Sequence, residues 1–328
     1  MKFKKNMLCA MLASAIALAT GNAQAGDALT FKLGFVDPAT SSYALGGQKF
    51  ADELEKMTNG QVKVEIVGGG TLGGEREMFE GVQMGTLDMG TAVNSVLSQF
   101  IPEMVLLDQP YLFDSAEQAR AAIDGKLGDL IREKAEAQGV HVIGWIESGF
   151  RDVFSKKPIT KIEDFKGVKI RTMENAMQIA AFNAVGAIST PMAFTEQYTA
   201  LQQGTIDANE NAVCNMLVNK YYEIIKNVTS THHQFTVIAV VVSDRAWNKI
   251  PDEYKPKMYE AMKIATKWQR EHLDKLNADA KVELEKLGVQ FHDIDRNAMK
   301  EIIVPKVADL RKDVPQEWLD AVNNAQAK

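Results

Sequence analysis

Hydrophobic and polar residues alternate along the chain with two periods, one typical of strands and one typical of helices. Residues 30–36 (TFKLGFV) alternate with the period of two that predicts a half-buried strand. The next segment places Phe50 and Leu54 at helical spacing and stops at the Asn-Gly pair 59–60, a common helix C-cap. We therefore predict a strand followed by a helix.

Strand-like and helix-like segments continue to alternate along most of the chain. Further strands are predicted at 62–67, 87–93, 140–146, 152–156, 167–171, 206–210 and 235–243, and further helices at 75–84, 115–138, 175–185, 195–203 and 252–287. This order predicts an α/β fold with largely parallel sheets.

Two heptapeptides indicate that the plan is repeated. VQMGTLD (82–88) and LQQGTID (201–207) share Gln, Gly, Thr and Asp in register, and each reads as a helix end, a glycine cap and a strand. We interpret them as equivalent positions of two α/β lobes, one centred before residue 150 and one after. The alternative is that helix–glycine–strand joints converge on similar residues. Two lobes imply a cleft, and α/β sheets bind ligands beyond the carboxyl ends of their strands.

The N-terminus has the pattern of a secretory signal peptide over residues 1–25. Three lysines precede an apolar run that is too short to span a bilayer, and Ala-Gln-Ala at 23–25 fits a cleavage site. Cleavage after Ala25 would leave 303 of the 328 residues and change the net charge from −6 to −9. We predict an exported protein, periplasmic in a Gram-negative host, with a charge that disfavours nucleic acid. Only Cys214 would remain, so no intrachain disulfide is expected.

The segment VGGGTLGGERE (67–77) resembles a dinucleotide fingerprint. Gly68, Gly70 and Gly73 fit G-x-G-x-x-G, and Asp88 follows 20 residues after the first of them. That fingerprint belongs after the first strand of a fold, whereas here a strand and a helix precede it.

The acidic residues that follow the glycines also oppose nucleotide binding. Glu75 and Glu77 occupy the favourable site at the start of the next helix and would repel a diphosphate. We interpret the glycines as a tight loop close to the cleft. Glu75 would then either accept hydrogen bonds from ligand hydroxyls or only complement the helix dipole.

Motifs for bond chemistry are missing from the sequence. G-x-S-x-G, H-E-x-x-H and C-x-x-C do not occur, and the five histidines are scattered apart from the adjacent pair 232–233. We therefore predict no catalytic residue, no metal site and no cofactor, and a protein that is not an enzyme.

Two arginines stand where strands end. Arg151 lies between two apolar strands, and Arg171 ends the strand GVKIR just before a helix. A guanidinium there can reach a cleft and pair with a carboxylate through two hydrogen bonds. The alternative for each is a salt bridge to a neighbouring helix.

Longer motifs resemble one transport family. They are TNGQVKVEI, TLGGEREMFEGVQMGTLDM, DQPYLF, ITKIEDFKGVKIRTMEN, PMAFTEQYTALQQGTIDANENA and VVVSDRAWNKIP. Their order and sequence resemble the dicarboxylate (DctP) type of solute-binding proteins of tripartite ATP-independent periplasmic (TRAP) transporters, from Phe31 to the last helix. The resemblance implies a periplasmic-binding-protein fold of two lobes, with crossing strands and a long helix that spans both.

The resemblance also implies which residues bind the ligand. Arg171 would form the salt bridge with a carboxylate, with Arg151 and Asn211 beside the same group, and Phe194 would stack over the ligand.

On the first lobe's side of the cleft, the resemblance implies that Glu75 and Asn94 line the site. The loop VDPATSSYALGG (36–47) departs from many sugar-acid and dicarboxylate binders, because it holds Tyr43 and no histidine. This departure leaves room for a larger or more apolar acid.

The lobes would comprise 26–148 with about 237–275, and 149–236 with about 276–328. The strand 235–243 fits a crossing strand, and 252–287 fits the spanning helix. The implied partners are a small organic acid and a pair of membrane permease subunits, with the binding protein itself a monomer. A sensory protein that presents ligand to a receptor and an exported oxidoreductase are the alternatives. The sequence leaves the identity of the acid open.

Overall fold

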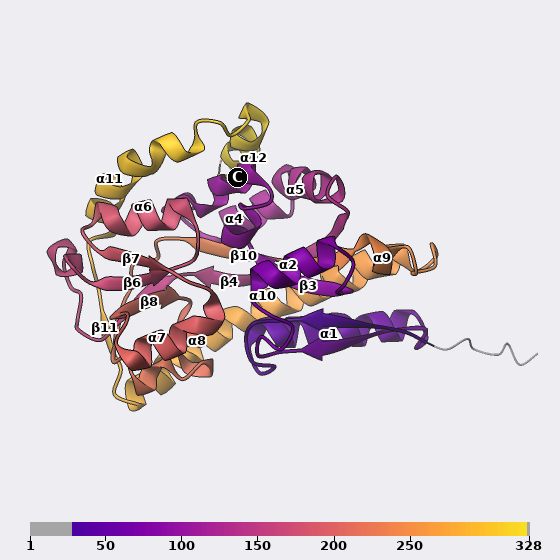
Figure 1. Cartoon of the computed structure of the whole chain (residues 1–328), viewed down its shortest axis with the longest axis horizontal. Coiled ribbons are helices and arrows are strands. Elements are labelled where there is room, and N and C mark those ends of the chain that lie inside the picture. The colour runs from indigo at the N-terminus through magenta and orange to yellow at the C-terminus, as the bar shows by residue number, and fades with distance from the viewer. Residues whose placement is uncertain (1–27, 327–328) are drawn as a thin grey trace, which may run out of the picture.

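The computed structural model describes residues 28–326, so the predicted signal peptide lies outside the described residues. Two sheets form the centres of two lobes (Figure 1). The first sheet has the order β2-β1-β3-β10-β4. Its strands are β1 (Leu29–Gly34), β2 (Val62–Val67), β3 (Met89–Val93), β4 (Val140–Phe150) and β10 (Phe235–Ser243).

The second sheet has the order β11-β9-β5-β8-β6-β7. Its strands are β5 (Asp152–Ser155), β6 (Lys169–Thr172), β7 (Ile188–Pro191), β8 (Ala208–Asn211), β9 (Asn227–Thr229) and β11 (Gln290–His292). The helices of the chain are α1 (Ser42–Met57), α2 (Glu75–Gln83), α3 (Asn94–Leu97), α4 (Ala116–Ile123), α5 (Lys126–Glu136), α6 (Ala176–Ala184), α7 (Gln197–Gln203), α8 (Val213–Val218), α9 (Asp244–Trp247), α10 (Lys255–Lys286), α11 (Arg296–Val307) and α12 (Gln316–Gln326).

Apolar side chains on both faces of each sheet are covered by helices. In the first lobe, α1 and α10 pack on one face, and α4, α5 and α12 pack on the other. In the second lobe, α6 and α11 share one apolar cluster, while α7 and α8 belong to another. Burial on both faces explains why β10 is apolar along almost its whole length.

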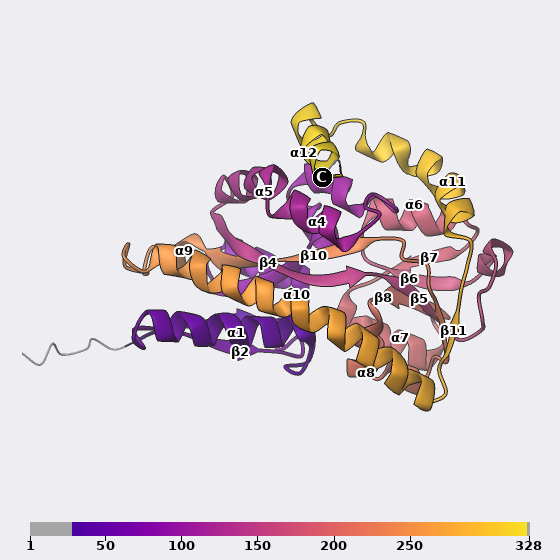
Figure 2. The same cartoon turned by 180° about the vertical axis from the view of Figure 1, so that it is seen from behind.

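Two chain segments cross between the sheets, as predicted. β4 of the first sheet leads through Arg151 into β5 of the second, and β9 of the second sheet leads back into β10. The helix α10 packs against α1 and β4 and then against α8, so it spans both lobes (Figure 2). The predicted two-lobed α/β fold with a spanning helix is confirmed.

The sheets are mixed and not largely parallel as predicted. β1 pairs in parallel with β2 and β3, but β10 runs antiparallel to both β3 and β4. In the second sheet, β5 runs antiparallel to β8 and β9. The crossing segments cause this, because a strand that returns from the other lobe enters the sheet in the reverse direction.

Two further details differ from the predicted elements. The helix predicted over 115–138 is two helices, α4 and α5, which are separated at Asp124 and Gly125. The last helix, α12, packs on α4 and α5 through Trp318 and Val322, whereas 276–328 was assigned to the second lobe. The other lobe limits stay a prediction.

Candidate functional site

A small cavity of about 30 Å³ lies where the two lobes meet. It is lined by Val36, Asp37, Tyr43, Glu75, Val93, Ser148, Arg151, Arg171, Met173, Phe194, Asn211, Thr236 and Ile238. Five of the six predicted site residues are in this set: Arg171, Arg151, Asn211, Phe194 and Glu75. The fold therefore brings together residues that are up to 136 positions apart in the sequence.

Arg171 presents a buried guanidinium at the cavity. It belongs to β6 and is 2% exposed, and its Nε and Nη2 donate to the Met192 carbonyl at 3.0 and 2.9 Å. Within residues 28–326 it forms no ion pair with a protein carboxylate. Burial lowers the pKa of Arg171 below its ordinary value. The backbone contact holds the plane of the guanidinium while its charge stays without a protein partner.

Arg151, in contrast, already has a carboxylate. Both oxygens of Glu210 accept from this guanidinium, one of them from Nη2 at 2.8 Å, and the Glu210 carbonyl accepts from Nη2 at 2.6 Å. His233 Nε2 lies 3.2 Å from the same carboxylate. Burial acts to raise the pKa of Glu210, but the charge and hydrogen bonds of Arg151, together with those of His233, outweigh it and lower that pKa to about 2. The Arg151 charge is thus largely neutralised within the second lobe.

Asn211 belongs to a hydrogen-bonded chain that joins the lobes. Its Oδ1 accepts from Ser148 Oγ at 3.2 Å, from Asn215 Nδ2 at 2.8 Å and, at 3.4 Å, from Arg151 Nη1. Tyr43, from α1 of the first lobe, donates to Ser148 Oγ at 2.5 Å and also accepts from Asn215. This tyrosine therefore stands directly at the site, where the family resemblance placed a histidine in other members.

Asn94 lies outside the cavity lining, contrary to the expectation for this residue. It is fully buried, and its Nδ2 donates to Asp108 Oδ1 at 2.6 Å while its Oδ1 accepts from the Val237 backbone at 3.2 Å. These bonds tie α3 to the strand β10. Asn94 therefore has a packing role behind the site.

A carboxyl residue that the sequence analysis missed faces the cavity beside Glu75. Asp37 lies three residues after the end of β1 and is 2% exposed, with Asn219 Nδ2 at 3.3 Å from its Oδ1. Burial raises the pKa of Asp37 to about 7. Burial and the nearby Asp37 raise the pKa of Glu75 to about 8. The position of Asp37 shortly after a strand, at the edge where α/β sheets bind ligands, could have indicated this residue from the sequence.

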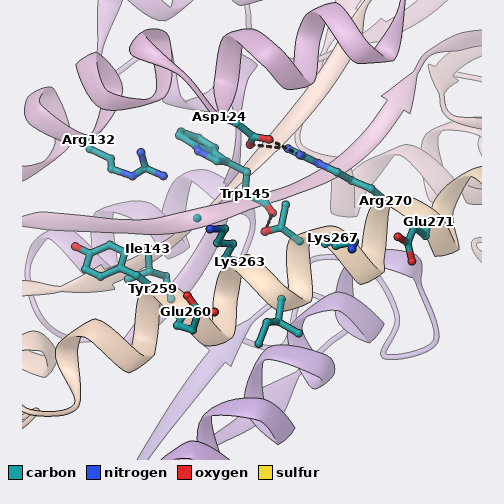
Figure 3. A pocket seen from close by; sticks show the side chains of 13 residues that line it. Asp124, Arg132, Ile143, Trp145, Tyr259, Glu260, Lys263, Lys267, Arg270 and Glu271 are labelled. Atoms are coloured by element: carbon teal, nitrogen blue, oxygen red, sulfur yellow. Dashed lines mark hydrogen bonds and ion pairs between the residues drawn. The ribbon is translucent and has the colours of Figure 1, made fainter.

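A larger cavity of about 590 Å³ lies elsewhere in the first lobe (Figure 3). It is bounded by α10, β4 and the end of α4, and none of the predicted site residues line it. Arg270 there is paired with Asp124, with Nη2 at 2.8 Å from Oδ1. We assign the candidate site to the smaller cavity, because it joins the lobes around Arg171, a buried cation without a carboxylate partner in the described structure.

Comparison with known proteins identifies the family. The family model of the bacterial extracellular solute-binding proteins, family 7 (DctP), matches residues 33–313. The chain belongs to this family.

Relatives of this solute-binding protein carry names that refer to organic acids. The 2,3-diketo-L-gulonate-binding periplasmic protein YiaO of Escherichia coli is 33% identical over 304 residues, which cover 91% of this chain and 93% of YiaO. The C4-dicarboxylate-binding periplasmic protein DctP of Rhodobacter capsulatus is 28% identical over 324 residues, which cover 96% of each chain. A TRAP periplasmic solute-binding protein from Polaromonas sp. JS666, solved with bound D-erythronate, is 34% identical, with a TM-score of 0.86 and coverage of 91% of this chain and 98% of that one.

The glycine-rich loop of this solute-binding protein lies near the cleft, and its backbone forms hydrogen bonds with the segment that follows β1. Gly69 N donates to the Asp37 carbonyl at 2.7 Å, and Gly70 N donates to the Phe35 carbonyl at 3.0 Å. A Cβ on Gly68 would lie 2.8 Å from Ala39 N, so the two backbones approach too closely for a side chain there. The loop thereby fixes Asp37 beside the start of α2.

No helix within residues 28–326 is long and apolar enough to cross a membrane. Nor does that range contain a group of three or more His, Cys, Asp and Glu side chains that could hold a metal ion.

The raised pKa of Asp37 predicts a pH dependence of stability. A carboxyl whose pKa is about 7 in the folded chain, against about 4 when unfolded, binds its proton more tightly in the folded state. The free energy of unfolding should then fall as pH rises, by about 1.4 kcal/mol per unit from this one group between roughly pH 5 and 6.5. Asp37→Asn should remove that part of the slope.

Denaturant unfolding at pH 5, 5.75 and 6.5 measures this slope. The matched control is Asp279→Asn, which changes a 65% exposed carboxylate on α10 and should leave the slope of the wild type. Equal slopes for the wild type and Asp37→Asn would contradict the prediction.

Proposed function

We propose that this chain captures a small organic acid by its carboxylate in the interlobe cavity and delivers it, in the periplasm, to the membrane permease of a TRAP transporter. The observation that carries the proposal is the Arg171 guanidinium. It is buried, its plane is fixed by the Met192 carbonyl, and its charge lacks a carboxylate partner within residues 28–326. A buried cation of this kind is costly unless an anion pairs with it.

The relatives support the same chemistry. Their ligands are a diketogulonate, C4-dicarboxylates and D-erythronate, which all carry a carboxylate. Asn211 and the Arg151–Glu210 pair flank Arg171 and would orient that carboxylate, and Phe194 would cover the rest of the ligand. Three or four charge-assisted hydrogen bonds of about 1.5–3 kcal/mol each, less the entropy of association, correspond to roughly micromolar affinity.

A thermal-shift screen tests the proposal. The panel holds C4 diacids, hydroxy and sugar acids, aromatic keto acids, and neutral sugars of matched size. An acid present at about 100 times its Kd stabilises the folded chain by about 2.7 kcal/mol, so at least one acid should raise the Tm while its neutral counterpart does not. If no acid raised the Tm, or if neutral sugars did so equally, the proposal would be wrong.

Ligand access requires the lobes to separate. A cavity of about 30 Å³ has space for little more than one water molecule, which is less than any acid of several carbons needs. Contacts between the lobes close it, including the bond from Asn219 Nδ2 to Asp37 Oδ1 at 3.3 Å and the contact of Tyr43 with Asn215. We propose hinge motion about the two crossing segments, with the ligand stabilising the closed arrangement.

Gly70→Ala should weaken binding through this closure. The new Cβ would lie 2.9 Å from Thr195 Cγ2 of the opposite lobe, a clash that exists only when the lobes are together. We expect the Kd of the best acid from the screen to rise about tenfold, equivalent to about 1.4 kcal/mol, by isothermal titration calorimetry.

Gly69→Ala is the matched control for this change. Gly69 has a similar φ of +72°, against +67° at Gly70, but no atom of residues 28–326 outside its immediate chain neighbours would lie within 4 Å of a Cβ at this position. Both variants should therefore lose similar stability, and only Gly70→Ala should lose affinity. Adding Thr195→Ser, which removes the clashing methyl, should restore the affinity. Equal affinities of the two glycine variants would contradict closure at this contact.

A further inference from the structure

We propose that Asp37 and Glu75 make this site selective for hydroxylated monocarboxylates against dicarboxylates of the same carbon skeleton. This inference rests on the proposed function, since it names the class of acid that the same cavity accepts. It concerns the wall of the cavity that faces Arg171, which the first lobe supplies.

The first lobe places both carboxyl groups at one wall. Asp37 follows β1, Glu75 begins α2, and the bond from Gly69 N to the Asp37 carbonyl at 2.7 Å holds their two loops together. Both residues line the cavity, and burial together with the nearby Asp37 raises the pKa of Glu75. The other first-lobe residues of this wall include the apolar Val36 and Val93. No lysine or arginine of the first lobe is among the lining residues in the described part of the chain.

The lining side chains offer a positive charge for one ligand carboxylate and not for a second one. On the second lobe, Arg171 is unpaired, while the charge of Arg151 is offset by Glu210. Arg171 is therefore the cation among the described lining residues that lacks a protein carboxylate partner. One ligand carboxylate neutralises it, but a second would be buried without a cation, and ionisation of either acid would add direct repulsion.

Hydroxyl groups suit the same wall in every protonation state. A hydroxyl can donate to an ionised carboxylate and can accept from a protonated one. Thr236 adds to this, because it lines the cavity and its buried Oγ1 has no hydrogen-bond partner in the described structure. A ligand with hydroxyls opposite its carboxylate can satisfy all three groups. A second carboxylate could accept from Thr236 or from a protonated acid, but it cannot donate to an ionised one, and it brings a buried charge without a cation.

Two pairs of acids with matched skeletons test the inference. D-Erythronate and meso-tartrate share a four-carbon chain and differ only in a terminal hydroxymethyl or carboxylate, and D-galactonate and galactarate form the six-carbon equivalent. By calorimetry at pH 7.5, the wild type should bind the monocarboxylate of at least one pair about 100-fold more tightly than its diacid, a difference of two decades in Kd. In the variant Asp37→Asn/Glu75→Gln, this ratio should fall at least about tenfold, mainly because the diacid binds better.

A charge-matched variant controls for the change in net charge. Asp279→Asn/Glu283→Gln also removes two carboxylates, which are 65% and 49% exposed on α10, and it should keep the wild-type ratio of the two Kd values.

The variant Arg171→Lys distinguishes a failure of the proposed selectivity from a failure of the proposed function. If a diacid bound the wild type as tightly as its partner and Arg171→Lys lost it, the selectivity would be overturned and the carboxylate site would stand. If neither pair bound, the preference for hydroxylated acids would also be overturned. If Arg171→Lys left the affinity unchanged, the proposed function itself would fail.

Discussion

Arg171→Lys is expected to raise the Kd for the organic acid about 100-fold or more, since both hydrogen bonds of a bidentate pair are replaced by one point contact. The guanidinium uses Nε and Nη2 on the Met192 carbonyl, at 3.0 and 2.9 Å, and this fixes the plane that it presents to the cavity. An ammonium has neither that plane nor a second donor arm. A difference of about 2.7 kcal/mol, roughly one charge-assisted hydrogen bond, corresponds to the expected factor.

Isothermal titration calorimetry with the best acid from the screen measures the loss. Arg245→Lys is the control, because Arg245 is 52% exposed and pairs with Asp88 at 3.2 Å on the surface. It should bind the acid like the wild type. Wild-type affinity of Arg171→Lys would remove Arg171 from the carboxylate site.

Glu210→Gln is expected to lower the free energy of unfolding by about 3–5 kcal/mol, the cost of leaving a buried charge without its partner. Glu210 is fully buried, and Arg151 donates to both of its oxygens and to its backbone carbonyl. A glutamine keeps the volume but removes the negative charge, so the buried Arg151 guanidinium loses its counterion. We expect Glu210→Gln to affect the stability of the fold more directly than ligand binding, because the Arg151–Glu210 pair lies within the second lobe.

Denaturant unfolding monitored by circular dichroism gives this free energy. Glu80→Gln is the matched control, since Glu80 is 39% exposed and forms a surface pair with Arg76 at 3.0 Å. It should change the free energy of unfolding by less than about 1 kcal/mol. A loss for Glu210→Gln as small as that of the control would show that Arg151 does not depend on this carboxylate.

Much of the fold could be predicted from local pattern. The apolar run 235–243 was predicted as a crossing strand and forms β10, all of whose residues are buried, and 252–287 forms the long helix α10. Strand direction was not predictable in this way, because the period of two is the same in parallel and antiparallel pairs. The reversal of β10 against β3 depends on the chain returning from the other lobe.

The sequence could predict which residues meet at the site, but not which of them already form ion pairs within the protein. Arg171, Arg151 and Asn211 meet at one cavity, yet the sequence did not indicate that Arg151 is already bound by Glu210. That pairing depends on β5 and β8 lying side by side in antiparallel register, which places residue 153 opposite residue 210. Asn94 directly follows β3, as Arg151 directly follows β4, and only packing shows that Asn94 does not line the site.

The glycine motif is a further case in which local sequence pattern does not indicate a contact between distant segments. Its spacing fits a nucleotide fingerprint, whereas in the fold the loop contacts the backbone after β1 and approaches Thr195 across the cleft. Asp37 owes its place beside Glu75 to this contact. Its position shortly after a strand indicates a place near the cleft, but not which residue lies beside it.

A crystal structure of the chain with the tightest-binding acid of the screen would show whether Arg171 binds the ligand carboxylate. We expect an enclosed ligand between the lobes, with both oxygens of its carboxylate at about 2.7–2.9 Å from nitrogens of Arg171 and its other end toward Asp37 and Glu75. A ligand bound outside this cavity, with Arg171 contacting only the Met192 carbonyl, would contradict it.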